Sequence, residues 1–279
     1  QLEMEVDEQQ MAEIQIKKKR PKKWLQNLKT FEEQFIGITR NSAQTTILNP
    51  EVIDFDNQAN RLIATARAPL KIRNNALGYE ITFYLSRFIY TRDGLNENVV
   101  TNGYSVYKEL EPVDTDQRQF WQKERNRAYR GSFTHFIHAL VADKLAEQGF
   151  RVYYTNKIRI PATGAEERRV DYPRGTLYNF TSDLTEISLF SSKSRYLRVV
   201  FEDEATEVGV LKSFKIKGSR SVALGSGEQT SWISFPDDRA IINIRNGKES
   251  SGMPAVLHGY WGYTHRLADL LPNNYKTSL

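Results

Sequence analysis

Cysteine is absent from this chain of 279 residues. That absence excludes disulfide bonds, thiol catalysis and thiolate metal sites, but it does not distinguish a cytoplasmic from an envelope compartment. Histidine is scarce, with four residues, so imidazole chemistry has few candidate positions. The sequence starts with Gln1 rather than Met. We therefore expect a processed or trimmed N-terminus, from which a signal peptide would already be gone.

Long apolar runs are also missing. No window reaches the ~18 uninterrupted apolar residues that a transmembrane helix needs, so the chain as given does not span a membrane as a helix. Hydrophobic residues make up 39% of the sequence and charged residues 26%, which is too apolar for disorder and indicates a globular fold. The length suits one large domain or two ordinary ones.

The excess of positive charge is confined to one short segment, KKKRPKKW. The net charge is +5 and six basic residues of this segment supply +6, so the remainder of the chain carries −1. A nucleic-acid domain would spread its basic residues over one face to meet phosphates, and no nucleic-acid partner is expected. The plain interpretation is a solvated basic linker over residues 17–23. The alternatives are a contact for anionic lipid or another acidic surface, and a nuclear-import signal. The six residues are Lys17, Lys18, Lys19, Arg20, Lys22 and Lys23.

Hydrophobic periodicity separates a short N-terminal piece from a main domain over residues 24–279. Residues 1–16 alternate apolar and polar residues around DEQQ, which predicts two short strands at the end of an upstream β-domain. WLQNLKTFEEQFIG has helical spacing and predicts a helix that stops at Gly37. From residue 49 to 110 the period falls to two, as in YEITFYLSRFIY, which predicts antiparallel sheet with one buried face.

Two helices are expected to interrupt the sheets at about residues 114–149. Asp114 is a good N-cap residue, Gly131 and Ser132 break the helical pattern, and the second helix is expected to end at Gly149. Strand-like segments then return, followed by a short C-terminal helix that Pro272 stops. The sequence therefore predicts an α+β fold, predominantly antiparallel β-sheet, with an N-terminal helix and a central helical pair.

Residues 120–140, FWQKERNRAYRGSFTHFIHAL, gather basic side chains, aromatic rings and two histidines. His135 and His138 lie three residues apart, so on a helix they share a side and are weak candidates for one metal ion. Zinc needs at least a third protein ligand, and no H-E-x-x-H or H-x-x-E pattern supplies it. Both histidines are expected to point away from the apolar face of their helix, toward solvent or a neighbouring element. Surface or capping histidines are therefore favoured, and no metal or cofactor is expected.

The same stretch has rings that could stack on nucleic-acid bases. However, Trp121 lies four residues before Arg125, and Arg125 lies four before Tyr129. At that spacing arginine and aromatic side chains pack together within one protein. Internal packing is the favoured interpretation.

No other catalytic pattern stands out in the sequence. GSGEQTS lacks the lysine and the spacing of a phosphate-binding loop, and no G-x-S-x-G nucleophile motif occurs. We expect no enzyme. A hydrolase that combines His135, His258 or His265 with a carboxylate stays open, and a cluster of those side chains in one cleft would favour it.

Residues 120–150 resemble the W-x-x-N-R-x-x-A-Y-x-G-S-x-x-H-F-x-x-x-L…G-F pattern of the Bacteroidota family usually called carboxypeptidase-like regulatory domain proteins. FEEQFIG, ILNPEVIDF, NNALGYEITFYLSRFIY and HGYWGYTHRLADLLPNNY extend the resemblance over roughly residues 24–279. Arg125 and Arg127 are alternatives for the arginine of the pattern. The positions that carry the resemblance, which we expect to be structural, are Trp121, Arg125, Arg127, Tyr129, Gly131, Ser132, His135, Phe136, Gly78, Tyr79, His258, Tyr260, Trp261, Leu271 and Pro272.

The resemblance implies an exported protein of the periplasm or outer membrane, preceded by a β-sandwich like the non-catalytic regulatory domain of carboxypeptidases. Residues 1–16 would be the last strands of that sandwich. Carboxypeptidase activity is not expected, because the zinc ligands are missing. We predict a non-enzymatic interaction or accessory subunit, with outer-membrane β-barrel assembly machinery or transporters as partners.

A glycan-binding module is the main alternative to that prediction. The sequence contains 14 tyrosines, and the segment HGYWGY is a candidate sugar platform. Tyrosine-rich sheets more often use their rings for packing, so the arrangement of the rings decides between the two.

Overall fold

The computed structural model of the protein describes residues 20–93, 96–158, 168–170, 173–191, 193–208, 210–211, 228–245, 249–251, 255–272 and 275. Its sheets are mostly antiparallel and its helices few, which confirms the α+β fold class. The strands predicted for residues 1–16, and Lys17, Lys18 and Lys19, lie outside these ranges. Across the ranges given, no helix has the length and apolar character needed to cross a membrane.

The first half of the chain forms one six-stranded antiparallel sheet. β5 organises it, because it pairs with β6 along its whole length and with β4 and then β3 on its other side. The sheet predicted over residues 49–110 is therefore confirmed, and the side chains of Ile81, Phe83 and Leu85 are buried on one face as the alternation predicts. The strands are β1 (Thr45–Ile47), β2 (Ile53–Gln58), β3 (Arg61–Ala66), β4 (Leu70–Asn74), β5 (Tyr79–Asp93) and β6 (Asn96–Glu109).

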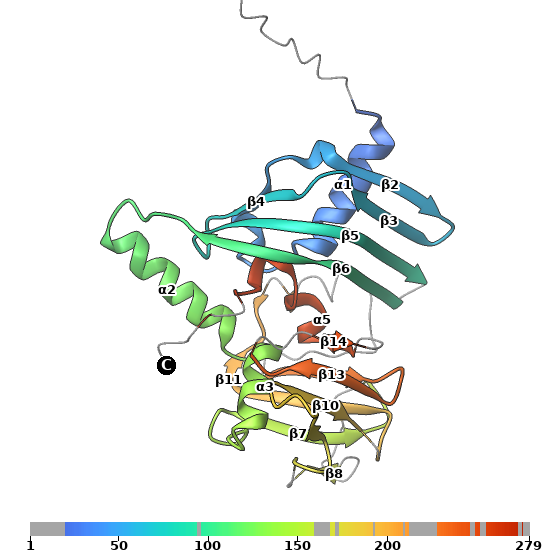
Figure 1. Ribbon diagram of the computed structural model, residues 1–279, viewed down its shortest axis with the longest axis vertical. Helices are drawn as coiled ribbons and strands as arrows, with labels where there is room; N and C mark the ends of the chain where they lie inside the picture. Colours follow the sequence, from blue (N-terminus) through green and yellow to red (C-terminus); the bar gives the residue numbers. More distant parts are fainter. Residues whose placement is uncertain are drawn as a thin grey trace, which may run out of the picture.

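The predicted N-terminal helix, α1 (Lys22–Phe35), covers the apolar face of this sheet (Figure 1). Phe31 and Phe35 are buried, and their rings meet Phe88 and Phe83 edge-on with centroids 4.8 and 5.0 Å apart. As predicted, the helix stops before Gly37, whose φ is 109°. The apolar stripe of α1 thus closes the core of the first half.

The linker predicted over residues 17–23 is wrong at its end, because α1 already begins at Lys22 and includes Lys23. Trp24 explains the early start. Its indole Nε1 donates to the carbonyl of Ile53 at 3.1 Å, and its ring packs against Phe55. These contacts hold the first turn of the helix on the sheet.

The central helical pair is α2 (Thr115–Tyr129) and α3 (Phe133–Val141). The carboxylate of Asp114 caps α2, as predicted, by accepting from the backbone N–H of Gln117 at 2.7 Å. Figure 1 shows α2 running from the first sheet down to α3, which lies on the second half of the molecule. The insertion therefore connects the two halves.

α3 is shorter than predicted, since it ends at Val141 and not at Gly149. Asp143 has a φ of 57°, which lies in the left-handed region and cannot continue a right-handed helix. A turn then leads to β7. Residues 142–149 have helical spacing in the sequence, but they form turns instead of a helix.

The second half contains two antiparallel sheets that share one apolar core with α3. The first has the order β15-β12-β11-β7-β8 and the second has the order β14-β13-β10-β9. The strands are β7 (Phe150–Thr155), β8 (Arg168–Arg169), β9 (Tyr178–Phe180), β10 (Glu186–Phe190), β11 (Tyr196–Ala205), β12 (Glu228–Ser234), β13 (Arg239–Asn243), β14 (Glu249–Ser251) and β15 (Val256–Gly259).

The C-terminal segment returns to the first half. The predicted single helix is divided into α5 (Tyr260–Thr264) and the 3₁₀ turn η4 (Leu267–Asp269), and both end before Pro272. Leu267 and Ala268 are buried in the core of the first half. The two cores are therefore joined at α2 and again at this segment.

Candidate functional site

α2 presents large side chains at four-residue spacing to the protein interior. Trp121 and Arg125 face a turn of the first sheet, whereas Tyr129 packs against the two histidines of α3. Trp121, Arg125 and Tyr129 are 6%, 7% and 8% exposed, so the predicted internal packing is confirmed. Phe120 lies beside this stripe and is 40% exposed. The buried rings of α2 do not form a stacking surface for a ligand.

Arg125 is bonded to a turn of the first sheet. Its Nε donates to the carbonyl of Leu77 at 2.7 Å and its Nη2 to that of Gly78 at 3.3 Å, while Nη1 lies 3.1 Å from Glu109. The aromatic partner of the guanidinium is Tyr79, whose ring centroid lies 4.1 Å away. The helical spacing suggested Trp121 or Tyr129 instead.

Trp121 and Gly78 fit together closely. The indole Nε1 donates to the carbonyl of Asn75 at 2.8 Å, and a Cβ on Gly78 would lie 2.3 Å from the indole ring. Gly78 also has a φ of 70°, which other residues rarely adopt. These two motif positions therefore form one contact between α2 and the first sheet.

The other end of α2 is attached to the second half. The carbonyl of Gly131 accepts from the indole Nε1 of Trp261 at 2.6 Å. Gly131 has a φ of 67°, and a Cβ there would lie 2.7 Å from the ring of Phe201. The motif residues at both ends of α2 thus fix the two halves to each other.

His135 is buried, at 5% exposed, so of the two predicted directions, solvent or a neighbouring element, it takes the second. Its ring packs edge-on against Phe150, with centroids 4.9 Å apart. Nδ1 accepts from the N–H of Gly131 at 3.1 Å, and Nε2 lies 3.0 Å from Oε1 of Gln148. Burial lowers the pKa of the imidazole, so it is neutral at pH 7.

His138 is half-buried and has a similar arrangement. Nε2 lies 3.4 Å from the carbonyl of Arg245 and Nδ1 lies 2.8 Å from the hydroxyl of Tyr129. A carbonyl only accepts, so Nε2 carries the proton and Nδ1 accepts from the hydroxyl. Burial lowers the pKa of this imidazole as well.

The H-x-x-H spacing therefore does not form a chelate. In both histidines the nitrogen with a lone pair already accepts a hydrogen bond from the protein. Among the residues that the structure describes, no group of three or more His, Asp or Glu side chains is placed to hold a metal ion.

A buried ion cluster lies on another side of α2. Glu124 is 1% exposed and sits between the guanidinium groups of Arg40 and Arg127. Nη2 of Arg127 also donates to Oδ1 of Asn41 at 3.1 Å, and Nη1 lies 3.7 Å from Glu207. Two cations around one buried carboxylate offset the cost of its desolvation.

Of the residues in this cluster, only Arg127 was predicted from the sequence. The only local signal was the spacing of three residues between Glu124 and Arg127. Arg40 and Glu207 come from segments far away in the sequence, which no helical or strand period connects.

Asp269 extends the cluster into the C-terminal segment. Its carboxylate accepts from Thr39 Oγ1 at 2.6 Å and from Asn41 Nδ2 at 2.8 Å. Burial raises its pKa to about 6, and the hydrogen bond from Thr39 opposes that rise. The backbone N–H of Ala268 donates to Ile36 at 3.0 Å, so η4 is bonded to the first half beside Asp269.

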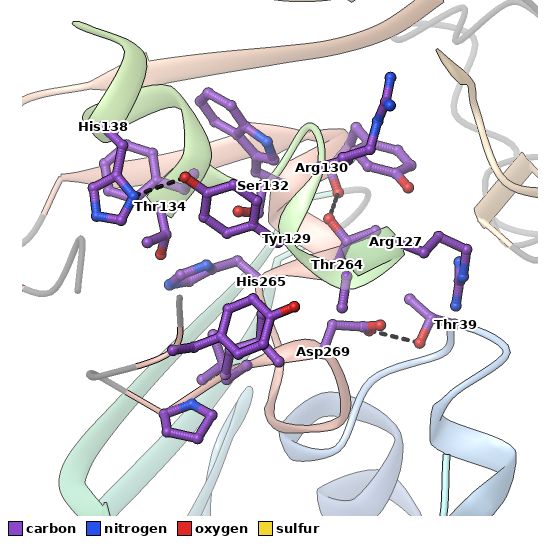
Figure 2. A pocket seen from close by; sticks show the side chains of 18 of the residues that line it. Thr39, Arg127, Tyr129, Arg130, Ser132, Thr134, His138, Thr264, His265 and Asp269 are labelled. Atoms are coloured by element: carbon purple, nitrogen blue, oxygen red, sulfur yellow. Dashed lines mark hydrogen bonds between the residues drawn. The ribbon is translucent and has the colours of Figure 1, made fainter. Parts of the chain in front are cut away.

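A cleft opens between the two halves where these groups meet. Figure 2 shows His138 and Tyr129 on one side, Asp269 and Thr39 on the other, and His265 between them. The cavity measures about 70 Å³. One water needs roughly 10–15 Å³ of such space, so the cleft holds a few waters or a small polar group. Tyr260, Leu271 and Pro272, all motif positions, also line it.

The histidines named for a hydrolase do not gather in this cleft. His265 lines it, whereas His135 and His258 do not. Nε2 of His258 lies 3.0 Å from Oγ of Ser234, and burial lowers its pKa to about 4. The three side chains are therefore dispersed.

The remaining predicted positions have plain structural roles. Phe136 is fully buried, and Ser132 caps α3 by accepting from the N–H of His135. Trp261 is 2% exposed, so the largest ring of HGYWGY, the candidate sugar platform, is packed in the core.

The basic segment is partly fixed to the sheet. Arg20 donates to the carbonyl of Glu51 at 2.7 Å and lies over the ring of Trp24. Lys22 and Lys23 are exposed on α1.

Comparison with protein-family models, with curated proteins and with solved structures finds no match to this chain.

Proposed function

We propose that this chain is a non-enzymatic protein of the cell envelope that acts as an interaction or accessory subunit. Its partners would be outer-membrane β-barrel assembly machinery or transporters, in the periplasm or at the outer membrane. The resemblance of residues 24–279 to a Bacteroidota envelope family motivates the location and the partners.

The observation that carries the proposal is the use of the family-motif side chains. Trp121 and Arg125 bind the turn of the first sheet, and Gly131 and Trp261 bind α2 to the second half. His135 and His138 already use their acceptor nitrogens within the protein. Side chains used in this way support a rigid scaffold that presents surfaces better than a catalytic centre.

The experiment is a mild-detergent pull-down of the full-length protein from its own membranes, with mass spectrometry of the proteins that co-purify. We expect a stoichiometric outer-membrane barrel or assembly factor. A protein that purifies alone at low and moderate detergent concentration would contradict the proposal. A matched purification of an unrelated tagged envelope protein identifies background proteins.

The enzyme alternative has its own test at the cleft. His138 and His265 line the cleft with Asp269, so a hydrolase would act there. Panels of ester, glycoside and peptide substrates are expected to give no turnover. Turnover that disappears in His265→Ala, while the fold is retained, would refute the non-enzymatic proposal.

A further inference from the structure

The outer face of the first sheet carries an exposed aromatic patch. On β5 and β6 the inward side chains pack beneath the sheet against α1, and the alternate side chains point outward. Among the outward side chains, Tyr84, Tyr104 and Val106 are 39%, 59% and 53% exposed. Several large apolar side chains are exposed to this degree in the described ranges, and these three are among them.

Strand register brings these three side chains together. Tyr84 lies opposite Tyr104, and Thr82 lies opposite Val106, in the β5–β6 pairing. The two tyrosine rings are stacked, with centroids 4.5 Å apart and planes 11° apart. One side of each ring is therefore occupied by the other ring, and the outer sides remain for a ligand.

Basic side chains surround the stacked pair. Lys71 lies opposite Thr82, Arg87 opposite Asn102, and Lys108 two residues beyond Val106 on the same face. All three are exposed, and none of them forms an ion pair with any other residue in the described ranges. Glu80 lies opposite both Arg73 and Lys108 in the strand pairing, and its carboxylate is 3.6 Å from Arg73, which balances its charge. We call Lys71, Tyr84, Arg87, Tyr104, Val106 and Lys108 the tyrosine face.

The charge of the tyrosine face is local. At the far side of the same sheet β2 carries Asp54 and Asp56, and Asp54 pairs with Arg67 at 2.9 Å. The positive charge is thus concentrated beside the exposed rings. In buried or paired positions arginine and lysine stabilise the fold, whereas three exposed cations that form no ion pair in the described ranges can form charge-assisted contacts with an anionic ligand beside the exposed rings.

We propose that the tyrosine face binds an acidic polysaccharide. The apolar face of a sugar ring packs on an aromatic ring, and carboxylate groups along the polymer form charge-assisted hydrogen bonds with lysine and arginine. Thr82, Ser86 and Asn102 lie among these side chains and offer neutral partners for sugar hydroxyls. Neighbouring strands of a sheet lie about 4.8 Å apart. The groups of the tyrosine face lie on three adjacent strands, so they extend over a surface that suits a ligand of several sugar units.

A polysaccharide fits better than nucleic acid. The tyrosine face has three cations interleaved with the neutral side chains of Thr82, Ser86 and Asn102, whereas a nucleic-acid surface gathers many basic residues along the phosphates. This inference is independent of the proposed subunit role, because a pull-down can fail while polysaccharide binding persists.

The test is affinity electrophoresis of the purified chain in gels that contain polygalacturonate, with unmodified dextran as the neutral polymer. We expect retardation by polygalacturonate and none by dextran. Tyr104→Ala, and a triple change of Lys71, Arg87 and Lys108 to Ala, should each weaken the apparent affinity by about fivefold or more. Tyr104→Phe keeps the ring and should bind within about twofold of the unchanged protein.

The matched control removes the same charge elsewhere. Lys29 on α1 and Arg118 and Lys123 on α2 are exposed, and their triple change to Ala should leave retardation unchanged. No retardation of the unchanged protein, or equal losses in the two triple variants, would refute the proposal. So would tighter binding to a single-stranded DNA oligonucleotide or to phosphatidylglycerol vesicles than to polygalacturonate. Circular dichroism of each variant separates lost binding from lost folding.

Discussion

Aromatic and basic side chains gather at two places in this protein, α2 and the tyrosine face, and the two places use them in opposite ways. On α2, Trp121 and Arg125 are buried, and their indole and guanidinium N–H groups have carbonyl or carboxylate partners. On the tyrosine face, Tyr104 and its neighbouring cations are exposed. The composition is similar, so the partners and not the residue types distinguish a structural contact from a binding surface.

The comparison predicts the largest loss of stability at Gly78. In Gly78→Ala the new Cβ would lie 2.3 Å from the Trp121 ring in a backbone with a φ of 70°. Backbone strain and overpacking together should lower the free energy of unfolding by about 4 kcal/mol in urea titration. Gly175→Ala is the control, since its φ is 77° and nothing lies within 4 Å of the new Cβ. It should cost about 1 kcal/mol; equal losses would show that the contact with Trp121 contributes nothing.

A smaller loss is expected at Arg125. Arg125→Ala leaves the buried carbonyls of Leu77 and Gly78 without their donor, which should cost about 3 kcal/mol. Lys123→Ala changes an exposed residue of the same helix and should cost less than about 0.5 kcal/mol. The two free energies of unfolding are measured under the same conditions. A loss at Arg125 as small as that at Lys123 would show that the buried hydrogen bonds of Arg125 contribute no more to stability than an exposed side chain does.

Asp269 makes the junction between the halves sensitive to pH. Its pKa is raised from 3.8 to about 6 in the folded protein, so the folded state binds the proton more tightly than the unfolded state. Its contribution to stability is therefore highest below about pH 4 and falls as the pH rises through 6. From pH 4 to pH 7 the fall should be about 2 kcal/mol.

Asp269→Asn removes this titration and keeps the shape of the side chain. The free energies of unfolding of both proteins are measured at pH 4 and pH 7. Relative to the variant, the unchanged protein should lose stability as the pH rises, because all other titrating groups are common to both. Parallel pH profiles would contradict the burial of the Asp269 carboxylate.

The smallest effect on stability is expected at the tyrosine face. Tyr104→Ala removes a cross-strand ring pair, which should cost less than about 1 kcal/mol. Urea unfolding checks this value. A loss as large as that of Arg125→Ala would make the tyrosine face a structural element like α2 and would remove the contrast between them.

Much of the fold follows from local periodicity. The spacing of Phe31 and Phe35 predicts α1, and the alternation of Ile81, Phe83 and Leu85 predicts the buried face of β5. Both are confirmed. The predicted end of α3 was wrong. Asp143 has a left-handed backbone conformation, which ends the helical region although the following sequence keeps helical spacing.

The sites were less accessible from the sequence, because they depend on pairings between distant segments. The helical wheel predicted that His135 points toward solvent or a neighbouring element. It could not choose between them, because the rings of Phe150 and Phe201 come from other strands. The alternation of apolar and polar residues in β5 already predicts that Tyr84 points outward. Its stacking on Tyr104, however, depends on a register that shifts between Leu85 and Arg87, and no residue pattern signals that shift.

The most direct test of this contrast is amide hydrogen exchange of the intact chain with and without saturating polygalacturonate. We expect slower exchange in β5 and β6 around Tyr84 and Tyr104, with unchanged exchange in α2 and in residues 260–272 around the cleft. Protection of the cleft or of α2, with β6 unchanged, would contradict binding at the tyrosine face. It would instead indicate that the ligand binds near the family-motif residues.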